Sequence, residues 1–441
     1  MTIDHNLVLR LSKRKNIYPW QTLMISLLFI LTAPFVNRIL MWIPFLIQLF
    51  RIVQYNEHIF MADIALLVSL GSIFRLPIGG AIGFLVAAAA IWYTIKNCRE
   101  SLDYGFGIMS VLVIYLLFRS NGALKQYIFI ATSLLLMYIM ARKCTPEDSI
   151  SIAKAFVIGI LIASIYGFIF RGSSAISYYI AENSIASVEF ADRFRFRAIF
   201  GDSNYYSAYL ILAMLLVQQL YLIKEITVFK AMVVWACLSC FGIMTYSRTF
   251  FLMLVLFSAA LLFSLFKNHH YIPGILFCIL TAIIIIWVLQ GKITIFNVVI
   301  SRLLGSGNLH NLTSGRNDLL VKYGTYIFQN TKTLLIGEGL SAKILGTKGT
   351  HNLYLEILYY IGSFGLILMS VYLMFLIRQL KKRYPFVYSL KERFSAFLPL
   401  CFFLVIYFTL QGMFSNALYI QIFVALSACL LQQNRMGKTM K

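Results

Sequence analysis

The sequence predicts an all-α, polytopic integral membrane protein, and three observations lead to this fold class. Of the 441 residues, 60% are hydrophobic and only 12% are charged, whereas a soluble domain carries about 25% charged residues. Apolar runs close to the ~20 residues that cross the hydrocarbon recur from end to end. The net charge of +22 lies largely between these runs, where Lys and Arg set topology and contact anionic lipid. We therefore expect membrane lipid, and not nucleic acid, as a partner.

The apolar runs predict one transmembrane domain over 1–441 with fourteen spans, or twelve as the alternative. In chain order they cover about 20–36, 39–54, 59–74, 77–95, 105–118, 124–140, 151–170, 205–223, 229–246, 249–266, 271–289, 353–377, 396–411 and 416–432. With the N-terminus inside, Arg51, Lys96 and Arg142 all fall on the inner side. Dropping one early run would move Lys96, Arg142 or both outside, so we expect an even count and both termini on the inner side.

Two long segments, 171–204 and 290–352, fall on the outer side of this topology. The first is balanced in charge, whereas the second, in which we expect short helices, has a surplus of cations. Its charged residues are Lys292, Arg302, Arg316, Lys322, Lys332, Lys343 and Lys348 against Asp318 and Glu338. This surplus indicates that the outer face meets an anion.

The end of the first outer segment, "DRFRFRAIFGDSN" (192–204), alternates arginine with phenylalanine. In an extended chain this alternation places Arg193, Arg195 and Arg197 on one side and the rings on the other. The arginines then form an anion-binding set, or the segment is an interfacial strand with its arginines at lipid headgroups. "TYSRTFF" (245–251) places Arg248 at an outer turn between two spans, where it either joins the anion site or fixes topology.

The stretch "LTSGRNDLLVKYGTYIF" (312–328) predicts a helix start, with Ser314 as the N-cap and Arg316 in the first turn. A helix N-terminus attracts anions through its free backbone N–H groups, and a guanidinium beside it favours phosphate. The alternative interpretation is an exposed surface arginine.

His351 stands in "GTKGTHNLYLEILYY" (346–360), where a loop becomes a helix. With Thr350 as the N-cap, His351 falls in the first turn of the span that runs to about Ile377. The positive end of the helix dipole disfavours imidazolium, so we expect a neutral ring that accepts a proton as a general base. The alternative is an interfacial residue that caps its own helix. We find no metal-ligand spacing and expect neither metal nor cofactor.

Four of these stretches resemble motifs of the O-antigen ligase and polymerase superfamily. "RAIFGDSNYYSAYL" is similar to its Arg-Gly-Asn motif, with Arg197, Gly201 and Asn204 in those places. "YSRTFFLMLVL" resembles its Ser-Arg turn and "SGRNDLL" its Gly-Arg helix. "LLIGEGL" and "THNLYLEILYYIGSFGLI" resemble its Gly-x-Gly and His-Asn motifs, although Glu338 between the glycines is a departure. The motifs span about 195–370 in the family's order, and 1–170 carry no motif that we match.

The resemblance implies a metal-independent, inverting glycosyltransferase of the membrane GT-C type. The family acts on undecaprenyl-diphosphate-linked oligosaccharides at the periplasmic face of the bacterial inner membrane, so 171–204 and 290–352 would be periplasmic loops. His351 would deprotonate the acceptor hydroxyl, assisted by Arg316 and Arg248. The diphosphate contacts implied by position are Arg197, Arg248 and Arg316, with Arg193, Arg195 and Asn352 as further candidates.

The acceptor separates two functions that share these motifs. A polymerase moves the growing glycan onto the next lipid-linked repeat unit, with a chain-length regulator and a flippase as partners, and this is the function we favour. A ligase moves it onto lipid A-core. A flippase is a third possibility, but transporters show internal repeats and midplane charges. We see no repeat here, and Asp63 is the main mid-span acid.

Overall fold

The computed structural model describes most of the chain, and nearly all of the described part is helical. The described residues are 18–97, 103–177, 195–267, 269, 271–272, 274–276, 278–279, 316–345, 349–383, 398–401 and 403–431. Their helices are α2 (Tyr18–Val36), η1 (Arg38–Met41), α3 (Trp42–Gln54), α4 (Glu57–Leu67), η2 (Val68–Leu70), α5 (Ala81–Lys96), α6 (Tyr104–Phe118), α7 (Leu124–Lys143), α8 (Pro146–Ile169), α10 (Ser203–Leu222), α11 (Val228–Ile243), α12 (Arg248–Lys267), α16 (Arg316–Gln329), α17 (Thr331–Ile336), α18 (Leu353–Arg383) and α20 (Asn416–Leu431).

These helices coincide with almost every apolar run of the sequence. The exceptions are 271–289, most of which lies outside the described residues, and 396–411, of which 398–401 and 403–406 are helical. Four helices, α7, α8, α10 and α18, are long and apolar enough to cross a membrane, and several others are apolar but shorter. The prediction of an all-α membrane protein is therefore confirmed. The exact number of spans stays a prediction.

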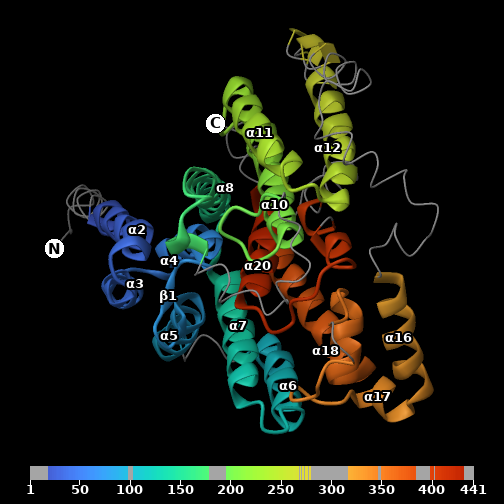
Figure 1. Ribbon diagram of the computed structural model, residues 1–441. Helices are drawn as coiled ribbons and strands as arrows, with labels where there is room; N and C mark the ends of the chain where they lie inside the picture. Colours follow the sequence, from blue (N-terminus) through green and yellow to red (C-terminus); the bar gives the residue numbers. More distant parts are fainter. Residues whose placement is uncertain are drawn as a thin grey trace, which may run out of the picture.

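Helices α10 and α20 occupy the centre of the molecule. The N-terminal helices α2 to α5 lie on one flank and α16 to α18 on the other (Figure 1). Nearly every residue of α10 and α20 is buried, as expected for a helix that is apolar on all sides. Asp202 caps α10, because its Oδ1 accepts the N–H groups of Asn204 at 2.6 Å and Tyr205 at 3.4 Å. The central helix therefore begins at a fixed point.

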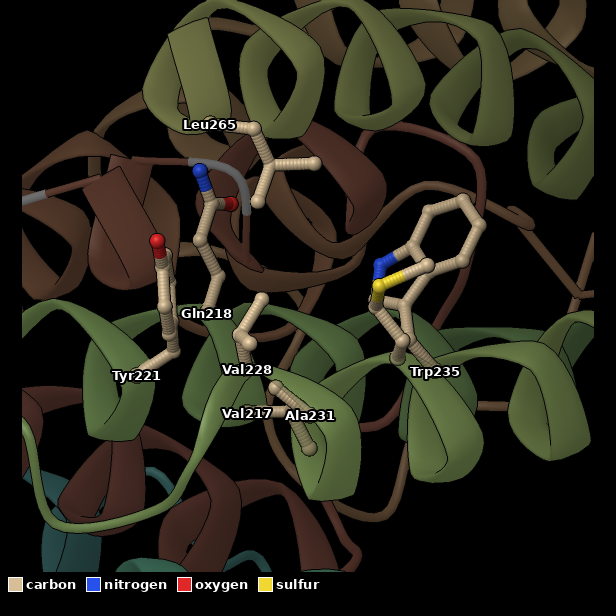
Figure 2. A pocket seen from close by; sticks show the side chains of 8 residues that line it. Val217, Gln218, Tyr221, Val228, Ala231, Trp235 and Leu265 are labelled. Atoms are coloured by element: carbon tan, nitrogen blue, oxygen red, sulfur yellow. The ribbon is translucent and has the colours of Figure 1, made fainter. Parts of the chain in front are cut away.

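The packing of α10 against α11 and α12 leaves little space. Figure 2 shows Gln218, Tyr221, Trp235 and Leu265 around a cavity of about 10 Å³. A single water needs roughly that volume. This contact is therefore helix packing, and a substrate has to bind elsewhere.

A short antiparallel hairpin interrupts the helical pattern. Strands β1 (Arg75–Leu76) and β2 (Gly79–Gly80) pair Arg75 with Gly80 and Leu76 with Gly79. Gly79 has φ +146°, a conformation that favours glycine over other residues. The Arg38 guanidinium donates to Leu76 O at 3.2 Å and ties the hairpin to η1.

Arg51 is not the loop cation that the charge pattern of the sequence suggests. It is buried in α3 and forms a bidentate ion pair with Asp63 of α4, with Nε–Oδ2 at 2.8 Å and Nη2–Oδ1 at 2.9 Å. Two buried charges are tolerated when they satisfy each other in this way. Asp63 is therefore paired within the helix bundle, and Arg51 carries no information about topology.

Helix α18 is broken at Gly362, where φ is +68°. A Cβ at this position would collide with Leu335 O, and a Cβ at Gly337 would lie 2.5 Å from Ile361 N. The segment "GEG" at 337–339 lies against the break. Glu338 N donates to Tyr359 O at 2.8 Å and Gly339 N donates to Tyr360 O at 2.9 Å. The two N–H groups satisfy carbonyls that a helix break leaves without partners.

Candidate functional site

The start of α18 differs from the prediction, because Asn352 and not Thr350 is the N-cap. Asn352 Oδ1 accepts the N–H groups of Tyr354 at 2.9 Å and Leu355 at 3.0 Å. Thr350 Oγ1 instead accepts Asn352 N at 3.3 Å and donates to Asn352 O at 2.9 Å. His351 therefore precedes the cap and lies outside the first turn. The argument for a neutral ring from the helix dipole loses its basis, and the side-chain oxygen of Asn352 already serves the helix end.

His351 itself has an unusual backbone conformation. Its φ is +48°, which is uncommon for a residue other than glycine. Its N–H points to Gln411 Oε1 at 3.4 Å, and its side chain is half-buried. A non-glycine residue held at positive φ costs about 1–3 kcal/mol and persists where its surroundings fix it. His351 shares this conformation with five other described residues, Asn121, Ala198, Lys224, Tyr246 and His269, so the backbone strain is consistent with a functional role but does not single out His351.

The loop between the 403–406 helical turn and α20 forms the other wall of this junction, and sequence reasoning missed it. Gln411 O accepts the Tyr205 hydroxyl at 2.6 Å. Glu356 Oε2 accepts Gly412 N at 2.7 Å and Met413 N at 3.0 Å. The loop is therefore held by α10 and α18 together. Glu356 itself could have indicated such a contact, because it is a lone acidic residue inside an apolar run.

Gly349 lets the two chain segments meet closely. A Cβ at this position would collide with the Gln411 side chain. A larger residue there would displace the end of the Gln411 side chain, which accepts the His351 N–H.

The arginine-bearing segment at 195–197 packs on the turn before α12. Arg195 Nε donates to Thr245 O at 2.9 Å, and its Nη2 donates to Asn204 Oδ1 at 3.0 Å. Ser247 Oγ donates to the same Asn204 oxygen at 3.3 Å. The Arg-Gly-Asn stretch and the Ser-Arg turn are thus joined through Asn204, directly before Arg248.

Arg195 and Arg197 differ in their surroundings, although they are two residues apart. Arg197 is exposed, and its Nη1 donates to Gly201 O at 2.9 Å. Arg193 lies outside the described residues, as does Ser314, and nothing is described of the side chain of Arg248, the first residue of α12.

Arg316 is the first residue of α16, as the helix-start pattern predicts, and its side chain is half-buried. Tyr205 follows Asn204 and donates to Gln411, whose side chain meets His351. The N-terminus of α10 is therefore the point at which three motif-bearing segments, at 195–204, 245–247 and 351, approach one another.

Glu338 has a structural explanation. Its Oε1 accepts the Tyr326 hydroxyl at 3.1 Å and the Thr333 hydroxyl. Burial and the neighbouring Glu338 carboxylate raise the pKa of Tyr326, so this tyrosine stays a hydrogen-bond donor at neutral pH. Glu338 ties α16 and α17 to the loop that supports the break in α18.

Comparison with known proteins leaves the function to be argued from these contacts alone. No protein-family model, no curated protein and no solved structure matches the chain. Within the described ranges, no three His, Cys, Asp or Glu side chains are grouped so that they could hold a metal ion. Independence from metal stays a prediction, which a chelation experiment tests.

Proposed function

We propose that this chain is an O-antigen polymerase of the GT-C type. It joins undecaprenyl-diphosphate-linked oligosaccharide repeat units by metal-independent, inverting glycosyl transfer. We place it in the bacterial inner membrane with twelve or fourteen spans, both termini cytoplasmic and the site periplasmic.

The observation that carries this proposal is the hydrogen-bonded path through Asn204, Tyr205 and Gln411. It links Arg195 and the 245–247 turn to the backbone of His351. These segments are far apart in the sequence and are the ones that carry the family resemblance. A histidine and the segments that carry Arg195, Arg197 and Arg248 near one point suit a reaction with a diphosphate leaving group.

The proposed reaction assigns a role to each group. His351 takes the proton of an acceptor sugar hydroxyl, whose oxygen attacks the anomeric carbon of the donor. The carbon–oxygen bond to the diphosphate breaks on the opposite face, the configuration inverts, and undecaprenyl diphosphate leaves. Arg197, Arg248 and Arg316 bind the diphosphate and stabilise its developing charge. Arg195, which holds Asn204 and the Thr245 carbonyl, positions the turn before Arg248.

The test compares His351→Ala, His351→Asn and Arg316→Lys at equal membrane expression, with donor binding and polymer formation measured separately. His351→Ala and His351→Asn are expected to bind lipid-linked donor normally and to lose polymer formation by ~10²–10⁴, the usual contribution of a general base. Arg316→Lys is expected to weaken donor binding as well, because an ammonium lacks the bidentate geometry of a guanidinium. Full activity of His351→Asn would exclude the histidine as the base.

The acceptor is identified in a deletion strain through its lipopolysaccharide ladder. A polymerase deletion loses long chains and retains a single repeat on lipid A-core. A ligase deletion loses every repeat from lipid A-core and accumulates polymer on the carrier, and that pattern would replace the polymerase proposal with the ligase.

A further inference from the structure

Another cavity lies beside the candidate site. It has a volume of about 450 Å³ and is lined by the β1–β2 hairpin, the starts of α5, α7 and α20, and Phe200 of the first outer loop. Small-molecule sites in proteins typically have volumes of ~300–1,000 Å³. The cavity is therefore large enough for part of a glycan.

The charges around this cavity favour an anion. Arg75 and Lys125 line it, and none of its described lining residues is acidic. The Lys125 ammonium lies 5.9 Å from the centre of the Phe129 ring. Gly80 begins α5 without a side-chain cap, so the first-turn N–H groups at Ile82 and Gly83 add to the positive potential.

The apolar part of the lining consists largely of aromatic rings. Phe84, Phe129, Phe200 and Phe414 all contribute, and the Phe84 and Phe129 rings meet edge to face at 6.5 Å. Ser415 and other polar residues of the lining supply hydrogen-bonding side chains. Flat rings beside polar side chains match a sugar, which presents C–H faces to rings and hydroxyls to polar groups.

The cavity is connected to His351 through one short loop. Gln411 contacts the His351 N–H, and Phe414, three residues later, lines the cavity. Three Cα–Cα steps span at most about 11 Å, so the Cα atoms of Gln411 and Phe414 are no farther apart than this. The Phe414 ring also packs on Tyr360 of α18, with centroids 4.8 Å apart.

We propose that this cavity binds an acidic sugar of the acceptor repeat unit, with Arg75 pairing its carboxylate or phosphate group and the phenylalanine rings packing on the sugar faces. The inference rests on the proposed function, because it assigns the cavity to the acceptor glycan of that reaction. It specifies a substrate class, a repeat unit that carries negative charge, which the resemblance does not supply.

The test measures binding to the full-length protein in lipid nanodiscs by calorimetry, without turnover. Three probes are used: a disaccharide that contains a uronic acid, its neutral counterpart with a hydroxymethyl group in place of the carboxylate, and farnesyl diphosphate. We expect the uronate to bind about 10-fold or more tightly than the neutral sugar. Arg75→Ala is expected to reduce uronate affinity by about 10- to 100-fold, the usual effect of losing a charged hydrogen bond, and Arg75→Lys to reduce it less.

Two further variants complete the test. Gly80 lines the cavity, and a Cβ there meets no atom within 4 Å, so Gly80→Leu adds bulk at the cavity wall without a clash at Cβ and is expected to reduce uronate binding. If Arg75→Ala does not fold, the uronate affinity of Gly80→Leu tests the inference in its place. Lys322→Ala, which removes an exposed cation of α16, is the matched control and is expected to bind like the wild type.

Several outcomes would overturn the inference. The first is equal binding of the acidic and neutral sugars, and the second is unchanged uronate affinity in Gly80→Leu. The third is that Arg75→Ala loses affinity for farnesyl diphosphate and not for the uronate. The last result would make the cavity a diphosphate site. If the protein forms polymer but does not bind the uronate more tightly than the neutral sugar, the assignment of the cavity is wrong and the polymerase proposal stands. Arg75-dependent uronate binding without any polymer counts against the polymerase and leaves the glycan site in place.

Discussion

Removing the Glu356 carboxylate is expected to release the loop that holds His351. In the folded protein Glu356 Oε2 accepts Gly412 N at 2.7 Å and Met413 N at 3.0 Å. Glu356→Ala removes this shared acceptor and leaves both backbone groups without it. The loop should then open locally while the helices on either side remain in place.

The size of the effect follows from the burial of the two donors. Met413 is fully buried and Gly412 is half-buried. A buried N–H without a partner costs ~1–3 kcal/mol, and the half-buried one is partly hydrated, so the two together cost about 2–4 kcal/mol. Since each 1.4 kcal/mol is a factor of ten, the two amides should exchange with solvent about 30- to 1,000-fold faster. Global unfolding is less informative, because an unfolding entropy of ~2.1 cal/mol/K per residue over 441 residues makes the Tm shift only about 2–4 °C.

Hydrogen exchange with mass spectrometry on peptides that cover Gly412 and Met413 measures this effect. Glu356→Gln keeps an acceptor oxygen for the two N–H groups, so it should accelerate exchange less than Glu356→Ala. Glu147→Ala, which removes an exposed acid of α8, is the control and should leave both amides protected. Unchanged protection in Glu356→Ala would refute the assignment of Glu356 as the residue that holds this loop.

Three further predictions concern residues around the site and the chemistry of the reaction. Arg195→Ala should lower thermal stability together with activity, whereas Arg197→Ala should weaken donor binding at unchanged Tm; the reverse pattern would exchange their roles. Burial would raise the pKa of Asp103, but the Tyr138 hydroxyl and other partners hold this pKa below its usual range. The resulting stability is present above the unfolded pKa of ~3.9 and is lost as pH falls through the lower folded pKa. Asp103→Asn should therefore flatten the acid side of a Tm–pH curve, and an identical curve would contradict this. Turnover should persist after exhaustive chelation; recovery only on addition of magnesium or manganese would contradict metal independence.

The helices could be predicted because a helix that lies in a membrane has a locally apolar composition. The apolar run at 205–223 corresponds to α10, Ser203–Leu222, and the run at 105–118 corresponds to α6, Tyr104–Phe118. The start of α16 at Arg316 was also predictable, since a capping residue followed by an apolar face is a local pattern. Such features depend on a few neighbouring residues, so one sequence is sufficient to find them.

The site was only partly predictable, because its contacts join distant parts of the chain. The sequence between 349 and 353 offers two capping residues, Thr350 and Asn352, and local reasoning chose the wrong one. Gln411 reaches His351 across a separation of 60 residues and Tyr205 across 206. The stretch that contains Gln411 reads as the end of an apolar run, so no local pattern marks it as part of a site.

The structure explains how a loop-to-helix junction can hold His351 in a fixed position. The first part of α18, 353–361, is fixed at its start by the Asn352 cap and by Leu353 N donating to Tyr407 O at 3.0 Å. It is fixed at its end by the Gly362 break, where Glu338 N and Gly339 N take up two carbonyls. A short helical segment anchored at both ends cannot slide along its axis. His351 therefore keeps its position and its strained backbone, because the glycine-rich loop at 337–339 braces the far end of the same segment.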